Sequence, residues 1–180
     1  LFTEQMTTER PREPSRNATS PTSTKRLIVG PCANWSRTVV LWNLAADPLN
    51  DPHTDNGGCP SCQGALTIDG DSATRNLAYY VIAHASQFVR PGSVRIASTA
   101  PGDRTVTLGE DEQRPKVYRA QIHRTRRRGA NAAFRTPDGK IVLIVANDSW
   151  SRRSISVQYN GRYAELNLAP GATGTFVWDE

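Results

Sequence analysis

The sequence has little cysteine and no long apolar run. Three cysteines occur among its 180 residues. No stretch of 18 or more apolar residues is present, which excludes a helix that spans a membrane. No signal peptide is visible either, and the chain opens at Leu1 in a short apolar segment that is typical of a strand interior. We therefore expect the sequence to be a piece of a longer protein.

The charged residues are unevenly placed. Apolar residues make up 37% of the chain and charged residues 22%, which is ordinary for a globular protein with a core. The formal charge is +5, and four arginines cluster in residues 123–128: Arg124, Arg126, Arg127 and Arg128. Such a run can contact phosphates, but no aromatic residues interleave it as a base-stacking surface requires. A solvated loop is favoured over a nucleic-acid site.

Cys59 and Cys62 form a C-x-x-C motif that has three interpretations: a redox pair, half of a zinc site, or a loop disulfide. A zinc site needs two more ligands, and no second C-x-x-C or H-x-x-x-H follows. The motif lies in a turn-rich segment rather than at the start of a helix, where a thioredoxin-like pair would lie. A structural staple or a pair of buried thiols is favoured, with metal and redox roles as alternatives.

The first half of the chain predicts buried strands that end on polar residues. Residues 1–4 indicate a short strand, and 5–24 a loop. Residues 25–36 indicate a helix interrupted near Gly30-Pro31. The continuous apolar run 38–43 is typical of a strand buried on both faces, as in a parallel sheet or barrel. A long polar loop, 46–65, follows it, as at the active-site face of an α/β barrel.

A helix is predicted to start with Asp71 or Ser72 as its N-cap and to end at residues 90–92. Its apolar face carries Leu77, Tyr80, Val81, His84 and Phe88 at helical spacing. A histidine on such a face is more often a packed, hydrogen-bonded residue than a catalyst. We therefore interpret His84 as structural.

The second half has the period of strands. Residues 132–135 and 140–145 flank a Thr-Pro-Asp-Gly turn, and residues 154–159 and 163–168 flank Asn160-Gly161. Short strands at 94–97 and 173–178 complete the pattern. Regularly spaced alternating strands predict an antiparallel β-sandwich. The change of period near residue 90 predicts two domains, 1–90 and 91–180.

Polar and aromatic residues at the predicted strand ends suggest a carbohydrate site. The group comprises Glu4, Trp42, Asn43, His53, Asp55 and Asn56. An aromatic ring packs on the face of a sugar, and carboxylates and amides pair with its hydroxyls. A core position for Trp42 is the alternative.

Several segments, in order, resemble glucosylceramidase-like enzymes of glycoside hydrolase family 30. Phe2-Thr3-Glu4-Gln5 is similar to the strand that carries the nucleophile, and 41–48 to the following barrel strand and its loop. The segment 79–93 resembles the last barrel helix and its exit. Residues 133–139 and 175–178 resemble the accompanying β-sandwich, whereas 5–24 and 99–129 match poorly.

The resemblance implies an α/β plus all-β architecture: the C-terminal portion of a (β/α)8 TIM barrel over 1–90, followed by an antiparallel β-sandwich. It implies that Glu4 is the catalytic nucleophile and that Trp42 lines the sugar site. Asn56 matches a site asparagine. The family often has Asp directly before the tryptophan, where this chain has Leu41, and Asp55 is a candidate replacement.

The resemblance also implies what this chain lacks. A retaining glycosidase uses two carboxyl groups about 5–5.5 Å apart, and the family's acid/base glutamate lies on a strand far upstream. A complete barrel needs roughly 250 residues. We therefore expect the longer protein to be a β-glucoside hydrolase and this chain alone to be inactive. No cofactor is implied, because the chemistry needs only carboxylates.

Some questions stay open at this point. Glucosylceramide, aryl or alkyl β-glucosides and β-1,6-glucans are all substrates within the group. A secreted protein without stable membrane insertion is expected, and the oligomeric state is not predicted. A non-catalytic carbohydrate-binding module built on 93–180 and a nucleic-acid-binding protein are the alternatives.

Overall fold

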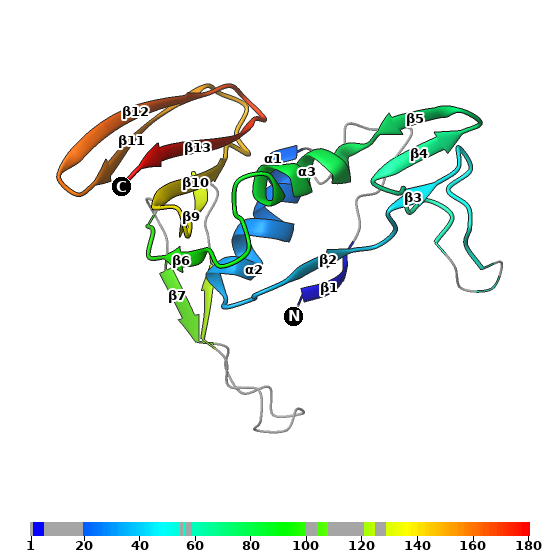
Figure 1. The fold of residues 1–180 in the computed structure, drawn as a ribbon, viewed down its shortest axis with the longest axis horizontal. Coiled ribbons are helices and arrows are strands. Elements are labelled where there is room, and N and C mark those ends of the chain that lie inside the picture. The colour runs from blue at the N-terminus through cyan, green and yellow to red at the C-terminus, as the bar shows by residue number, and fades with distance from the viewer. Residues whose placement is uncertain are drawn as a thin grey trace.

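The structure is a computed structural model that describes residues 2–5, 20–54, 56, 59–99, 104–107, 121–124 and 129–180. It is mostly β-structure with few helices. Figure 1 shows the helices in the middle, with a group of long strands on one side and a small sheet on the other. The chain begins with strand β1 (Phe2–Gln5), which pairs in parallel with β2 (Val39–Leu41).

The segment between β1 and β2 contains a continuous helix over residues 20–33. It consists of α1 (Ser20–Thr24), a π-helical turn (Lys25–Val29) and α2 (Gly30–Ala33). The predicted loop over 5–24 is therefore wrong for residues 20–24, and the predicted interruption at Gly30-Pro31 is wrong as well. In the π-helical turn the Gly30 N–H donates to the oxygen of Lys25, five residues earlier, and the helix continues through Pro31. Burial of the apolar residues 27–29 favours this continuation.

Residues 66–75 form a hairpin rather than the start of a helix. Strand β3 (Ala45–Ala46) pairs in parallel with β4 (Leu66–Asp69), which pairs antiparallel with β5 (Ser72–Arg75). Gly70 has φ +54°, so Asp69-Gly70 turns the chain between these strands. Helix α3 (Leu77–Ser86) begins only after Asn76. The predicted N-cap at Asp71 or Ser72 is therefore wrong.

The later strands form the predicted antiparallel layers. A four-stranded sheet has the order β13–β10–β9–β6 and comprises β6 (Val94–Ile96), β9 (Ala130–Arg135), β10 (Lys140–Ala146) and β13 (Thr173–Asp179). A separate hairpin comprises β11 (Arg153–Tyr159) and β12 (Arg162–Leu168). Strands β7 (Arg104–Thr107) and β8 (Gln121–Arg124) pair with each other. Both predicted hairpins, at 136–139 and at Asn160-Gly161, are confirmed.

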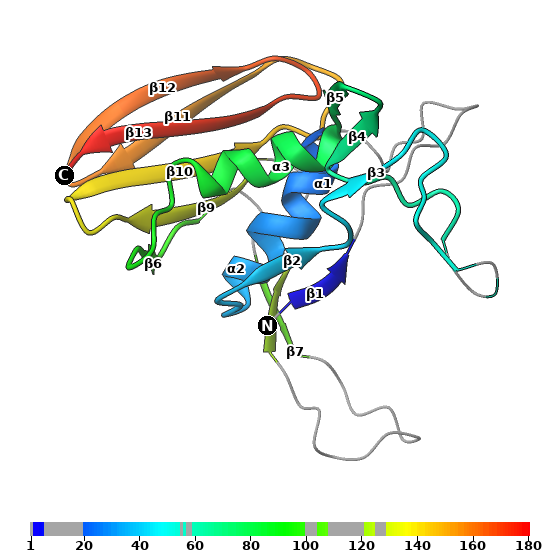
Figure 2. The same ribbon diagram turned by 45° about the vertical axis from the view of Figure 1, so that its right-hand side comes forward.

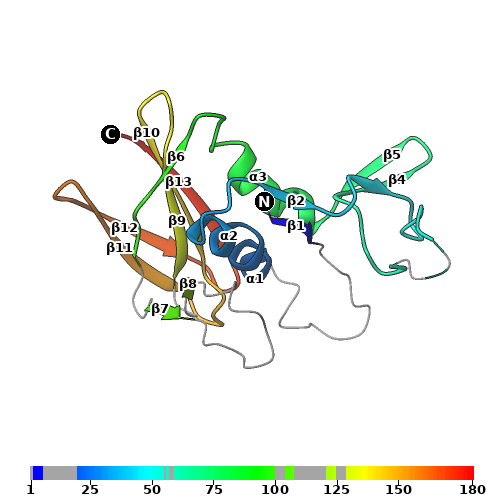
Figure 3. The ribbon, with the colours of Figure 1, turned by 90° about the horizontal axis from the view of Figure 1, so that it is seen from below.

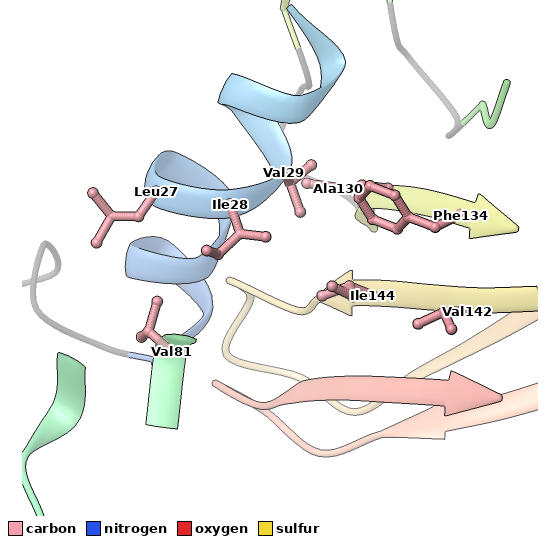
Figure 4. Packing of buried hydrophobic residues seen from close by; sticks show 9 residues of the cluster. Leu27, Ile28, Val29, Val81, Ala130, Phe134, Val142 and Ile144 are labelled. Atoms are coloured by element: carbon pink, nitrogen blue, oxygen red, sulfur yellow. The ribbon is translucent and has the colours of Figure 1, made fainter. Parts of the chain in front are cut away.

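The four-stranded sheet is covered on both faces. Figures 2 and 3 show the β11–β12 hairpin on one side of it and the helices on the other. On the helical side, the side chains shown in Figure 4 pack together: Leu27, Ile28, Val29, Val81, Ala130, Phe134, Val142 and Ile144. On the hairpin side, a second cluster contains Ala133, Leu143, Val145 and Leu168. Alternate residues of β10 face opposite layers, which explains its unbroken apolar sequence.

The helical layer and the sheet share one hydrophobic cluster. Val81 of α3 lies before the predicted boundary near residue 90, and Phe134 and Ile144 lie after it. The division into two domains, 1–90 and 91–180, therefore stays a prediction. Among the described residues, parallel pairing is limited to β1–β2 and β3–β4, which is far from a complete barrel. No described helix is long and apolar enough to cross a membrane.

Candidate functional site

Two neighbouring parallel strands bring the first predicted site residues to one edge. Phe2 pairs with Val39, and Gln5 pairs with Leu41. Two residues of β1 but only one residue of β2 therefore lie between these two pairs. Glu4 lies within this irregular segment of β1. Irregularities of this type re-aim side chains and are frequent next to active sites. Parallel strands end at a common edge, and the residue after Leu41 follows the last pair of this edge, Gln5–Leu41.

Trp42 is that residue, and it is not a core side chain. Its side chain is 51% exposed directly after β2. Asn43 has φ +65°, a left-handed conformation that asparagine tolerates better than most residues. The Asn43 oxygen accepts a hydrogen bond from the Ala65 N–H at 3.1 Å. This turn anchors the chain after β2 while the indole of Trp42 faces solvent.

The loop that follows is held by an aspartate. Asp47 Oδ1 accepts hydrogen bonds from the N–H groups of Leu49 and Asp51, each at 2.8 Å. His53 Nδ1 lies 2.7 Å from Asp51 Oδ1, so a carboxylate orients this imidazole. Asn56 is exposed, and its main-chain oxygen accepts the Thr54 hydroxyl at 3.5 Å. The candidate Asp55 lies outside the described residues.

The C-x-x-C motif is a disulfide. Cys59 and Cys62 are bonded, with Cys62 buried, which agrees with the loop-staple interpretation. Close to it in the chain, Gly64 packs so tightly on the main chain of Ala45 and Ala46 that an added Cβ would lie 2.8 Å from their atoms. The base of the loop is thus fixed on both sides. Among the described residues no group of three or more His, Cys, Asp or Glu could hold a metal ion.

His84 lies at a packing contact. Its Nδ1 is 3.0 Å from Thr175 Oγ1, and that hydroxyl donates to the His84 main-chain oxygen at 3.0 Å. Because the hydroxyl has a single proton, it accepts from the imidazole, which places the ring proton on Nδ1. Burial lowers the pKa of His84. The residue links α3 to β13, as the structural interpretation predicts.

The arginine run and the third cysteine are not part of the predicted strand-end group. Arg124 belongs to β8, and most of the arginine run is outside the described residues. Cys32 is a free cysteine whose pKa is raised by burial, with the charge of Arg95 acting in the opposite direction. Burial therefore favours the thiol over the thiolate at this position.

Sequence reasoning identified the strand ends but missed the supports of the loop. In the structure Glu4 lies in β1 directly before the Gln5–Leu41 pair, and Trp42 follows Leu41 directly after β2. It leaves Asn56 exposed in the loop. The Asp51–His53 pair and the hydrogen bonds that Asp47 accepts from Leu49 and Asp51 were not predicted. The Asp-x-His spacing is the one local signal that could have indicated the pair.

Comparison with known proteins places these features in a family. The family model described as "Glycosyl hydrolase family 30 beta sandwich domain" matches residues 124–176. The endo-1,6-β-D-glucanase neg1 of Aspergillus fumigatus is 41% identical over 66 residues, which cover 37% of this chain and 14% of that protein. The endo-1,6-β-D-glucanase of Neurospora crassa is 34% identical over 133 residues, 72% of this chain and 24% of that protein. The chain thus spans about a quarter or less of the length of these curated relatives.

Two solved structures share the arrangement over the whole chain. The endo-β1,6-glucanase BT3312 superposes with a TM-score of 0.71 at 25% identity and is covered over 35% of its length. SrfJ from Salmonella typhimurium gives a TM-score of 0.69 at 19% identity, over 34% of its length, and shows likeness of fold. The family model, the relatives and the shared fold agree with the resemblance to this family. The chain belongs to glycoside hydrolase family 30, and its residues 124–176 match the β-sandwich domain of that family.

Proposed function

We propose that the longer protein containing this chain is a retaining β-glucan hydrolase. In this proposal residues 1–90 form the end of a (β/α)8 barrel, and residues 91–180 form the β-sandwich domain. The parallel pairing of β1 with β2 carries the proposal, because Glu4 lies in the irregular segment of β1 and the half-exposed Trp42 follows directly after β2. A nucleophilic carboxylate and an aromatic ring that packs on the sugar are two of the groups that a retaining glycosidase site uses.

Glu4 is the proposed nucleophile. Its carboxylate attacks the anomeric carbon and forms a glycosyl-enzyme ester, while an upstream carboxylic acid gives its proton to the leaving oxygen. The same upstream group then removes a proton from water, which displaces Glu4 and releases the sugar with its configuration retained. Trp42 packs on the face of the bound sugar. The chain by itself lacks the second carboxyl group and is proposed to be inactive.

The proposed substrate is a β-1,6-linked glucan. Three relatives, from Aspergillus fumigatus, Trichoderma harzianum and Neurospora crassa, are endo-1,6-β-glucanases by name. We favour this substrate over glucosylceramide and simple β-glucosides for that reason. Asn56 and Asp55 are proposed to contact sugar hydroxyls from the loop above the edge. A polymer of this type lies outside the cell, so secretion is proposed as well.

The Glu4→Gln variant of the longer protein tests the role of Glu4. The amide is nearly isosteric but cannot form the glycosyl ester, so we expect hydrolysis of β-1,6-glucan to fall at least about a thousandfold. A β-glucoside with fluorine at C2 and a good leaving group should label the wild-type protein. Mass spectrometry should then find the added sugar on the peptide that contains Glu4.

The matched control is Gln5→Glu, which leaves Glu4 in place. Combined with Glu4→Gln, it tests whether an acidic residue at another position of β1 can support hydrolysis. Gln5→Glu in the Glu4→Gln background should remain inactive, because position 5 is paired with Leu41 whereas position 4 lies in the unpaired, irregular segment of β1. Labelling of a peptide elsewhere in the protein, or full activity of Glu4→Gln, would show that Glu4 is not the nucleophile.

A further inference from the structure

A groove lies between the tip of the β11–β12 hairpin and strand β13. Its volume is about 370 Å³, and its walls include Tyr159, Arg162, Leu166, Trp178 and Glu180. This size is at the lower end of the range for sites that bind small molecules. In Figures 1, 2 and 3 the helical layer lies between this end of the sandwich and strand β1. The groove is therefore separate from the β1–β2 edge.

Aromatic and aliphatic side chains form the apolar wall of the groove. The rings of Tyr159 and Trp178 meet edge to face, with centroids 6.0 Å apart and planes at 70°. Each ring fixes the orientation of the other, and both stay partly exposed. Val157 and Leu166 extend the same wall toward the sandwich core. A flat ligand face with C–H groups would find a rigid surface here.

Polar groups converge at the outer end of the groove. Tyr159 Oη donates to Glu180 Oε1 at 2.8 Å, and Arg135 Nη1 lies 3.8 Å from Glu180 Oε2. The Glu180 main-chain N–H donates to the Gly139 oxygen at 3.1 Å. The carboxylate is thus held in place and keeps lone pairs that can accept further hydrogen bonds. Arg162 adds donors on the opposite strand of the wall.

We propose that this groove is a second carbohydrate site, which binds a pyranose unit of a β-linked glucan chain. A pyranose has apolar C–H faces for the Tyr159–Trp178 wall and equatorial hydroxyls for Glu180 and Arg162. The choice of a glucan rests on the proposed function. A site so placed holds the polymer on the sandwich domain while another part of the chain lies at the catalytic edge. Such two-point attachment raises the effective concentration of substrate.

A peptide strand is the competing occupant. Within the described part of the chain, β12 pairs with β11 alone and β13 with β10 alone, so both strands leave an edge beside the groove. An extended segment of the longer protein could pair with such an edge. It would not, however, make use of the fixed Glu180 carboxylate and of Arg162. Sugar binding is therefore measured both on this chain and on the longer protein.

The test is a titration of the full chain with a β-1,6-linked glucose tetrasaccharide, followed by NMR at the indole N–H of Trp178. We expect this signal to shift on binding. Arg162→Ala and Glu180→Ala should each weaken binding about tenfold, because each removes a charged hydrogen-bonding group. Trp150→Ala is the matched control: its side chain is 80% exposed outside the groove, and binding should be unchanged. Thermal unfolding of each variant confirms that it is folded, and Tyr159→Phe, which frees Glu180 without removing the ring, gives a second, milder test.

The outcomes separate this proposal from the proposed function. Equal binding by wild type, Arg162→Ala and Glu180→Ala would show that the sugar binds elsewhere, which would overturn the proposal of a sugar site in this groove. Binding by the chain but not at Trp178 of the longer protein would mean that a strand fills the groove, which also overturns it. Binding at Trp178 in both, with no hydrolysis of any β-glucan by the longer protein, supports the groove and overturns the proposed function. Hydrolysis of β-glucan by the longer protein, without sugar binding at Trp178 of either protein, supports the proposed function and overturns the sugar site in the groove.

Discussion

Asn147 ties together the loops at one end of the sandwich. Its side chain is buried, and Nδ2 donates to the main-chain oxygens of Ser151, Leu168 and Ala169. Its Oδ1 accepts from both the N–H and the hydroxyl of Ser149. One amide therefore satisfies main-chain groups from two connections, which a residue of another shape cannot reproduce.

We expect Asn147→Ala to lower the free energy of unfolding by about 2–3 kcal/mol, because it leaves several buried groups without partners. Urea denaturation measures this change. Ser149→Ala removes the hydroxyl and its contacts with Asn147, Ser151 and Arg153, but leaves the three main-chain acceptors of Asn147 Nδ2 in place, and it should cost less than half as much. Equal costs for the two variants would show that the Asn147 side chain is not the centre of the network.

His84 gives the stability of the chain a pH dependence. Burial lowers its pKa in the folded state, so the unfolded chain binds its proton more readily. The free energy of unfolding should therefore fall as the pH drops below the ordinary histidine pKa of about 6.5. His84→Gln keeps a donor toward Thr175 without the titration and should flatten this part of the profile. A wild-type profile that is already flat between pH 7 and pH 5 would contradict the assignment.

At the scale of elements, the β11–β12 hairpin depends on its two-residue turn. Asn160 and Gly161 both have positive φ, +47° and +76°. This is the conformation that an Asn-Gly turn favours, and its twist matches that of the strands. The sequence signal and the geometry agree at this point.

We predict that Gly161→Ala lowers the free energy of unfolding by about 1–2 kcal/mol, since a Cβ is disfavoured at this φ. No atom lies within 4 Å of the added Cβ, so the cost is conformational rather than a clash. Asn160→Gly at the neighbouring position is the control, and it should change stability by only a few tenths of a kcal/mol. Chemical denaturation of both variants tests the prediction, and an unchanged Gly161→Ala would contradict it.

Elements with strong local signals were predictable, and those decided by packing were not. The hairpins at 136–139 and at 160–161 follow from turn residues between alternating strands. The helix over 20–33 was predicted only in part, because its first turn is rich in Ser, Thr and Pro, and burial of Leu27 and its neighbours determines the outcome. The start of α3 was misplaced because Asp69-Gly70 suits a hairpin turn as well as a helix start.

The candidate site was predictable to a similar extent. The rule that parallel strands end at a common edge predicted that β1 and β2 lie side by side, and their parallel pairing agrees, whereas the roles of Glu4 and Trp42 stay predictions. Contacts within the loop depend on side chains that meet only after folding. For that reason the hydrogen bonds of Asp47 to the loop and the Asp51–His53 pair could not be predicted from the sequence.

At the scale of the whole molecule, β10 is the shared wall of two cores. Ile144 faces the helices, and Leu143 faces the hairpin. Because the helical layer packs on the same sheet that supports the hairpin, neither layer has a core of its own. The molecule should therefore behave as one cooperative unit across the predicted boundary near residue 90.

Ile144→Ala should lower the free energy of unfolding by about 2–5 kcal/mol, the usual range for a buried isoleucine. Far-UV circular dichroism and tryptophan fluorescence should report the same lower midpoint. Leu143→Ala, on the opposite face, is the matched variant and should shift both signals together as well. Two separate transitions in either variant would show that the helices and the sandwich unfold independently.

The π-helical turn at Lys25–Val29 has a consequence for how the sequence can change length. A π-helical turn holds one residue more than an α-helical turn. The side chains before and after it therefore point in the same directions as in a regular α-helix that is one residue shorter. Loss of one residue inside this turn converts it to regular α-helix and leaves Pro31 and the buried face in position. Loss of a residue anywhere else in the helix rotates all that follows by about 100° and carries the apolar face off the sheet. Relatives of different length should therefore differ at this turn, where the helix can gain or lose a residue without moving its partners.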